Sequence, residues 1–147
     1  MEEWKDIPGY IGLYQASNYG QIRSCEGKVT SNAWSGHRVW KQRILKQKMS
    51  ANAKGRRDMR IELWKDGEHK TWLVSRLVAL AWCDGYQEGF TVNHKNGNNL
   101  DNRAANLEWL SHGDNIRHAF ANGLYPQAKK GRDYSYQDVA SSAACGR

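Results

Sequence analysis

The sequence lacks the features that mark several other classes of protein. Its three cysteines are widely spaced and form no Cys-x-x-Cys pair, which argues against a zinc ribbon and against a disulfide framework. No apolar run approaches the roughly 20 residues that a membrane-spanning helix needs, so we expect no membrane partner. The acidic, polar residues 1–6 are unlike the start of a secretory signal. These absences predict a cytoplasmic protein.

Apolar residues are also scarce, at 39% of 147 residues. Seven tryptophans and seven tyrosines supply much of the apolar volume that is present, and each ring is large enough to anchor a small core. The chain length fits one domain or two very small ones.

Positive charge is concentrated in one block. The net charge is +7, and nearly all of the excess lies in residues 25–60. The basic side chains of the segment 38–60 are Arg38, Lys41, Arg43, Lys46, Lys48, Lys54, Arg56, Arg57 and Arg60. A clustered basic surface suits a polyanion, because neutralising phosphates releases condensed counterions. The alternative is a solvated loop with surplus charge, and composition alone does not decide between them. Trp34 and Trp40 either stack against the same partner or belong to the core.

The first half of the chain reads as short strands followed by a helix. We expect strands near 14–16 and 21–24, joined by a turn at 18–20. Residues 26–56 show little periodicity, and we expect part of them to be a mobile loop that orders on a partner. Alternating residues at 60–64 and 69–74 flank the strong turn Asp66-Gly67 and predict a hairpin. Ser75 is expected to cap a helix with Val74, Leu77 and Val78 on its core face.

The second half predicts a compact strand, loop, strand and helix. The strands are expected at 90–93 and 107–110, separated by a long loop rich in Asn and Gly. Ser111 and Asp114 have the spacing of a capping box, and the helix that they open is expected to end at Asn122, before Gly123.

This second unit brings polar side chains together. Asn93 and His94 end the first strand, while Asn115 and His118 are three residues apart on the helix and share a face. A strand end with a helix packed across it can bring Asn93, Asn115 and His118 around one point. A lone His beside Asn is often structural, and Asn115 with His118 is compatible with a solvated helix face. The combination beside a basic block favours chemistry instead.

That chemistry is phosphodiester hydrolysis. A hard divalent cation such as Mg²⁺ or Mn²⁺ accepts amide oxygens, keeps waters and binds phosphate oxygens. His94, next to a ligand but pointing the other way, could take a proton from the attacking water. Asn106 could bond the backbone near His94 and hold the loop in place.

These motifs resemble the HNH endonucleases. The segments VNHKNGNNLDNRAANLEWL at 92–110 and DNIRH at 114–118 are similar to their core, in the homing-type branch common in bacteriophages. The segments at 3–10 and 14–24 resemble the short module that precedes the core in that branch. Residues 72–82 resemble the helix between them. The resemblance covers residues 3–125.

The resemblance implies a role for each site residue. His94 would be the general base, Asn93 and Asn115 ligands of one divalent cation, Mg²⁺ or Mn²⁺, and Asn106 the middle Asn that props the loop. His118 lies near the last His of the family's motif and is a second candidate ligand. Asn93 stands where many relatives carry Asp or His, which predicts modest metal affinity.

We therefore expect an α+β protein, with a small antiparallel N-terminal sheet plus helix followed by a ββα-metal (His-Me finger) nuclease core. The expected parts are a DNA-binding module at 1–89 with the basic segment 38–60, an HNH core at 90–125 and a polar, basic tail at 126–147. The resemblance implies hydrolysis of double-stranded DNA that leaves a 5′ phosphate. One site per chain predicts a monomer that nicks one strand, whereas a double-strand break needs a dimer or two successive events.

Two alternatives remain open beside a homing-type or free-standing phage nuclease acting in the host cytoplasm. One is a DNA-binding protein that has lost cleavage. The other is an accessory nuclease subunit of phage DNA packaging, active only beside a partner. Relatives often continue into a helical DNA-reading module, so here we expect recognition to come from the N-terminal module and the basic segment.

Overall fold

The computed structural model describes residues 1–34 and 36–123, so the predicted tail at 126–147 lies outside the described residues. The strands are β1 (Trp4–Asp6), β2 (Tyr14–Ser17), β3 (Ile22–Ser24), β4 (Val29–Asn32), β5 (Gly36–Val39), β6 (Arg43–Ile44), β7 (Lys48–Ala51), β8 (Arg57–Lys65), β9 (Glu68–Leu73), β10 (Thr91–His94) and β11 (Leu107–Leu110). The helices are α1 (Val74–Trp82), α2 (His112–Ala121) and a 3₁₀ turn, η1 (Ala104–Asn106).

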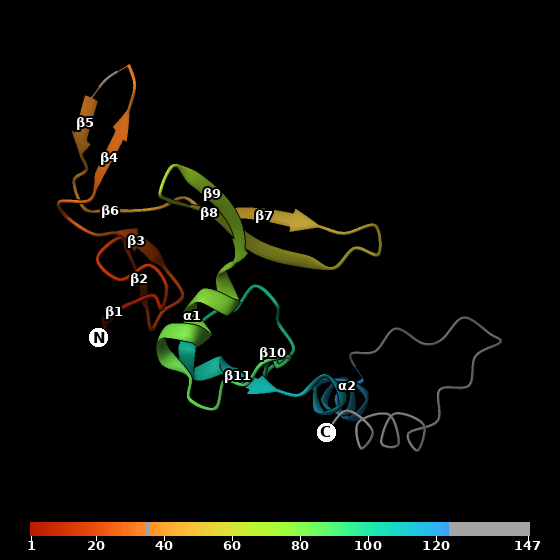
Figure 1. The fold of residues 1–147 in the computed structure, drawn as a ribbon. Helices are drawn as coiled ribbons and strands as arrows, with labels where there is room; N and C mark the ends of the chain where they lie inside the picture. Colours follow the sequence, from red (N-terminus) through yellow and green to blue (C-terminus); the bar gives the residue numbers. More distant parts are fainter. Residues whose placement is uncertain (35, 124–147) are drawn as a thin grey trace.

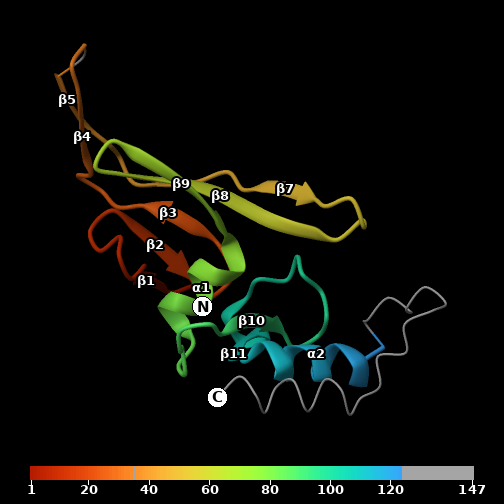
Figure 2. The same cartoon turned by 45° about the vertical axis from the view of Figure 1, so that its right-hand side comes forward.

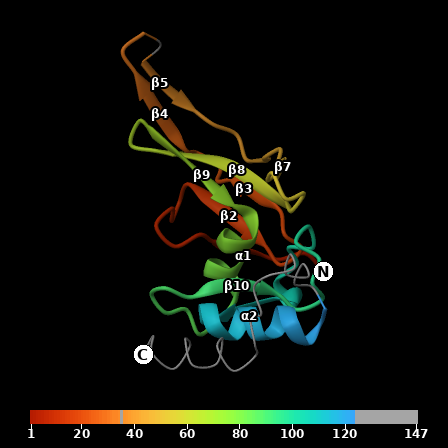
Figure 3. The same ribbon diagram turned by 90° about the vertical axis from the view of Figure 1, so that its right-hand side faces the viewer.

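The strands form four small sheets in which every pairing is antiparallel. Their orders are β1-β2-β3-β6, β7-β8-β9, β4-β5 and β10-β11. The hairpin β4–β5 projects from one end of the molecule and α2 lies at the other (Figures 1 and 3). The expected α+β class is confirmed, with strands β10 and β11 followed by α2 at the C-terminal end.

Residues 26–56 contain more regular structure than their lack of periodicity suggests. The expected mobility of part of the segment stays a prediction. This segment contains four strands, β4 to β7, of which β6 pairs with β3 and β7 pairs with β8. The hairpin β4–β5 is exposed along β5 and therefore needs no apolar side chains on a buried face. Such a hairpin leaves no alternating pattern in the sequence, which explains why its strands were not predicted.

The hairpin β8–β9 matches its prediction. Asp66 and Gly67 have φ values of 53° and 78°, the pair of positive angles that a type I′ turn requires. Strand β8 starts earlier than expected, at Arg57, because β7 pairs along its first residues.

Helix α1 forms the centre of the core. Val74, Leu77 and Val78 are fully buried, as their helical spacing predicts. The expected cap at Ser75 is wrong, since Leu73 is the N-cap residue and makes no side-chain capping bond. Ser75 lies within the first turn and is buried there.

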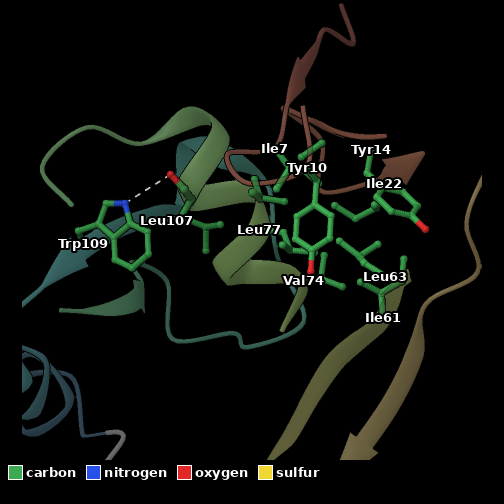
Figure 4. Packing of buried hydrophobic residues seen from close by; sticks show 13 residues of the cluster. Ile7, Tyr10, Tyr14, Ile22, Ile61, Leu63, Val74, Leu77, Leu107 and Trp109 are labelled. Carbon is green, nitrogen blue, oxygen red and sulfur yellow. Dashed lines mark hydrogen bonds between the residues drawn. The ribbon is translucent and has the colours of Figure 1, made fainter. Parts of the chain in front are cut away.

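The core joins the N-terminal strands to the hairpin β10–β11 through α1. Figure 4 shows side chains from the first sheet and β8 on one side of the helix and those of β11 on the other. The Trp109 indole N–H donates to the Ala79 carbonyl at 3.3 Å, and the Trp82 indole N–H donates to the Ala16 carbonyl at 3.0 Å. The N-terminal and C-terminal parts therefore share one core. Within the described residues, neither helix is long and apolar enough to cross a membrane.

Candidate active site

The hairpin β10–β11 presents two different faces. Asn93 lies directly opposite Glu108, and His94 lies directly opposite Leu107. Opposed residues share a face and successive residues alternate, so Asn93 and Glu108 face one way and His94 the other. Helix α2 packs beside this hairpin, while α1 lies between it and the N-terminal strands (Figure 2).

Asn93 and Asn115 both make side-chain hydrogen bonds on the same face of this hairpin. The Asn93 amide N–H donates to the Glu108 carboxylate at 2.8 Å, and the Asn115 amide N–H donates to the Thr91 hydroxyl at 3.1 Å. Thr91 is two residues before Asn93 and therefore shares its face. Helix α2 thus places Asn115 over the face that carries Asn93, as the sequence predicts.

The side-chain oxygens of Asn93 and Asn115 are suitable ligands for a hard divalent cation. Both amide nitrogens are used in hydrogen bonds within the protein, and an amide oxygen can only accept or ligate. Among residues 1–34 and 36–123, neither of the two amide oxygens accepts a hydrogen bond. Oxygen atoms of this kind are the ligands that Mg²⁺ and Mn²⁺ prefer, so the residues present fit such an ion.

His118 is less well defined as a ligand. It lies one turn after Asn115 on α2 and is half-buried. Within the described part of the chain, its ring has no hydrogen-bond or ion-pair partner that would orient it toward Asn93. Its backbone carbonyl accepts from the Asn122 side chain, and Asn122 is the C-cap residue, one position before the expected cap at Gly123. Metal binding by His118 stays a prediction.

His94 is held by a residue that the sequence analysis did not single out. The ring atom Nε2 lies 2.8 Å from Oδ1 of Asn102. Because an amide oxygen has no hydrogen to donate, Nε2 carries the hydrogen of this bond. His94 is only 7% exposed, less than expected for a base that must reach a water molecule. This burial counts against the general-base role and makes His94 the first residue to test.

Asn106 ties the loop between β10 and β11 together. Its side-chain oxygen accepts from the Asn96 backbone N–H at 3.0 Å, and its amide N–H donates to the Asp101 carbonyl at 2.9 Å. The backbone carbonyl of Asn106 also accepts from Lys95, the residue after His94. These bonds to the backbone near His94 are of the kind expected for a residue that stabilises the loop.

An ion pair reinforces the same loop. The Arg103 guanidinium donates to the Asp101 carboxylate at 2.7 and 2.8 Å, and Asn96 donates to it at 2.8 Å. The hydrogen bond from Arg103 is the main cause that lowers the pKa of Asp101 to about 2. The carboxylate therefore stays charged, and the loop stays pinned, at any pH near neutrality.

Comparison with known proteins finds matches to both parts of the chain. Two family models match the chain, a NUMOD4 motif at residues 2–56 and an HNH endonuclease at residues 84–117. The chain is 37% identical over 127 residues to the DNA endonuclease I-HmuI of Bacillus phage SP01, covering 86% of this chain and 63% of that protein. The chain therefore contains a NUMOD4 motif followed by an HNH endonuclease domain.

Further comparisons find other HNH endonucleases. A solved structure of DNA binding and cleavage by the HNH homing endonuclease I-HmuI has a TM-score of 0.62 and 35% identity, covering 95% of this chain and 66% of that one. An HNH endonuclease of Acanthamoeba polyphaga mimivirus is 36% identical over 124 residues, covering 84% of this chain and 32% of the relative. The chain thus spans less than two thirds of the length of these curated relatives. The expected likeness to the phage homing-type branch, with a module before the core, is confirmed.

The basic segment 38–60 is a surface feature of this chain. All nine basic side chains of the segment 38–60 are exposed. Lys48 and Arg60 lie directly opposite each other on β7 and β8. Like charges at opposed positions of a sheet destabilise it, and a bound anion would relieve this repulsion. The arrangement favours a polyanion over the alternative of surplus solvated charge.

The two tryptophans of this region have different surroundings. Trp34, at the end of the β4–β5 hairpin, is 99% exposed, which excludes the core role considered for it. Trp40 is half-buried, and its indole N–H donates to Thr30 at 2.7 Å. The Arg38 guanidinium lies 4.1 Å from the centre of the Trp40 ring, and that of Arg43 lies 5.2 Å from it.

Two residues of this site were missed by the sequence analysis. Glu108 could have been found, because pairing the predicted strands 90–93 and 107–110 puts it opposite Asn93. Asn102 could not, because it is one of several Asn residues in a loop without periodicity. Its contact with His94 depends on how that loop folds.

Proposed function

We propose that this chain is a divalent-metal-dependent endonuclease that hydrolyses phosphodiester bonds of double-stranded DNA, with His94 as the general base. The observation that supports this most strongly is the pair Asn93 and Asn115. Each amide nitrogen donates a hydrogen bond to a protein partner on one face of β10. The side-chain oxygens are therefore oriented by the protein and available to bind a ligand. The names of the relatives, DNA endonuclease and HNH endonuclease, are consistent with this activity.

HNH endonucleases generally use a divalent metal, and we propose one Mg²⁺ or Mn²⁺ for this chain. Asn93 and Asn115 would hold it through their side-chain oxygens, with His118 as a second candidate ligand. When bound, such an ion supplies Lewis-acid stabilisation of charge on the phosphate and on the departing 3′ oxygen.

The chain's own residues would activate the water. His94 follows Asn93 directly and points to the other face of β10, and Asn102 holds its Nε2. Its Nδ1 would then take the proton from the attacking water, with Asn106 keeping the loop in shape. Attack on phosphorus with departure of the 3′ oxygen leaves a 5′ phosphate.

The exposed basic surface would hold the DNA. Contacts from Arg38 to Arg60 would neutralise backbone phosphates and position the duplex without reading its sequence. With one site per chain, we propose that a monomer nicks one strand.

A plasmid-nicking assay tests the proposal. With Mg²⁺ or Mn²⁺, the wild-type protein should convert supercoiled plasmid to open circles, and EDTA should stop it. His94→Ala should slow nicking by at least about 100-fold, because it removes the proton acceptor, while DNA binding in EDTA persists. His69→Ala, which changes an exposed histidine on β9, is the matched control and should nick normally. Equal nicking by wild type and His94→Ala contradicts the mechanism.

The second candidate is a DNA-binding protein that has lost cleavage. The burial of His94 favours it, because a proton acceptor with 7% exposure has little access to water. This alternative predicts salt-sensitive DNA binding by the wild type with no nicking in any divalent metal.

A further inference from the structure

The N-terminal module contacts the nuclease loop at a glycine. Gly20, in the turn between β2 and β3, has a φ of +88°. A Cβ placed on Gly20 would lie 2.8 Å from the backbone oxygen of Asn102 and 2.9 Å from its carbonyl carbon. Both distances are shorter than real Cβ atoms show, so any other residue would force one of the two segments to move. The turn and the loop therefore meet at a distance that only glycine allows.

Two hydrogen bonds connect the turn at residues 18–20 to its neighbours. The Ala104 backbone N–H donates to the Asn18 carbonyl at 2.9 Å, which joins the loop to the same turn. The Gln47 side-chain amide donates to the Gly20 carbonyl at 2.8 Å. Gln47 lies in the basic segment, so the turn contacts that segment on one side and the loop on the other.

The loop residue at this contact is the partner of His94. Asn102 is 6% exposed, and its side-chain oxygen is 2.8 Å from the His94 ring. A hydrogen bond of this length weakens steeply when its atoms shift or its angle closes. Moving the backbone of Asn102 therefore changes the bond that orients His94.

We propose that the turn at residues 18–20 fixes the position of Asn102, and that Asn102 thereby sets the tautomer and orientation of His94. Asn102 is a positioning residue, and Gly20 supports it from the N-terminal module. For catalysis this rests on the proposed function, since it matters to cleavage only if His94 is the base. The consequence is that the N-terminal module completes the nuclease site as well as binding DNA.

The tautomer is tested first, by a measurement that needs no cleavage. Long-range ¹H–¹⁵N NMR correlations distinguish the two neutral imidazole forms, and the spectrum of His94→Gln identifies which of the five histidines is His94. We expect the Nε2–H form in the wild type and in Asn102→Asp, which keeps an oxygen acceptor. Asn102→Leu, which has a similar shape and no acceptor, should give a mixture of both forms. An Nδ1–H form in the wild type, or no change in Asn102→Leu, overturns the proposal.

The support from Gly20 is tested by kinetics. Gly20→Ala should lower the single-turnover nicking rate by about 10- to 100-fold, because small displacements of a catalytic group have effects of this size. The dissociation constant for DNA, measured in EDTA, should change less than about 2-fold. Gly12→Ala is the matched control, because Gly12 also has a positive φ, +77°, but has no atom within 4 Å of the added Cβ. Equal rates for the two glycine variants overturn the role of Gly20.

Two further comparisons separate positioning from general damage to the fold. The double variant Gly20→Ala/Asn102→Leu should be no slower than Asn102→Leu alone, because both changes act through one hydrogen bond. Asn99→Ala, in the same loop, should nick at the wild-type rate. Additive losses overturn the proposal. If the wild-type protein does not nick DNA at all, the proposed function fails, and the NMR result still decides the contact between Asn102 and His94.

Discussion

The two ends of this molecule use polar residues in opposite ways. In the basic segment 38–60, nine charged side chains are exposed on strands and turns. In the nuclease hairpin and its loop, the four side chains Asn93, His94, Asn102 and Asn106 are buried. Exposed charges act at long range and can replace one another, whereas a buried amide bonds particular partners in a defined geometry. The effects of single substitutions should therefore be small at the first end and large at the second.

The largest effect should come from the two amides that are proposed to hold the metal ion. Asn115→Leu removes one amide oxygen with little change in side-chain volume, and we expect nicking to fall by at least about 100-fold, comparable to the loss of other groups that stabilise charge in a transition state. DNA binding measured in EDTA should be unchanged, because Asn115 is remote from the basic segment in the chain and contacts Thr91 of β10.

A second test of the metal ligands exchanges the amide of Asn93 and the carboxylate of Glu108. Asn93→Asp/Glu108→Gln moves the carboxylate to the ligand position and lets the new amide donate the hydrogen bond that Asn93 now donates to Glu108. A carboxylate binds a hard cation more tightly than an amide, so the metal concentration for half-maximal nicking should fall by about 10-fold. Asn93→Asp alone puts two carboxylates at opposed positions and should gain less. No change in metal dependence in either variant would place the ion elsewhere.

The basic segment should respond differently. Lys46→Gln, Lys48→Gln, Arg56→Gln and Arg57→Gln combined should flatten the dependence of DNA affinity on salt, because each lost phosphate contact lowers the slope by about 0.9. The nicking rate at saturating DNA should stay close to that of the wild type. Filter binding or anisotropy across a series of salt concentrations measures the slope.

Removal of two positive charges elsewhere is the control for this prediction. Lys65→Gln and Lys70→Gln remove two exposed lysines from the β8–β9 hairpin, outside the segment 38–60. The salt slope should remain that of the wild type. If the quadruple variant keeps the wild-type slope as well, the DNA lies on another surface.

The same contrast explains what the sequence could predict. The hairpin turn Asp66-Gly67 and the strand at 107–110 have strong local signals, and both were predicted correctly. The strands between residues 26 and 56 were missed, because a hairpin exposed to solvent has no apolar alternation. Ser75 was misplaced because its residue type favours a cap, whereas packing buries it inside the first turn of α1.

The site shows the same limit. His94, Asn106 and Asn115 belong to a motif with fixed spacing and can be named from the sequence. Asn102 acts through a loop whose path depends on contact with Gly20, more than 80 positions earlier in the chain. No local pattern encodes a contact of that kind.

The smallest effect should come from an exposed ion pair within the buried region. Arg103 is 63% exposed, so solvent screens its pair with Asp101, and Asp101→Asn should lower the Tm at pH 6 by no more than about 3 °C. The pKa of Asp101 is lowered to about 2 from 3.8. The carboxylate therefore stabilises the fold above its unfolded pKa, and this stabilisation is lost as pH falls through about 2. The difference in Tm between the variant and the wild type should shrink between pH 4 and pH 2, as measured by circular dichroism. A difference that persists at pH 2 would show that Asp101 acts through its shape and hydrogen bonds and not through its charge.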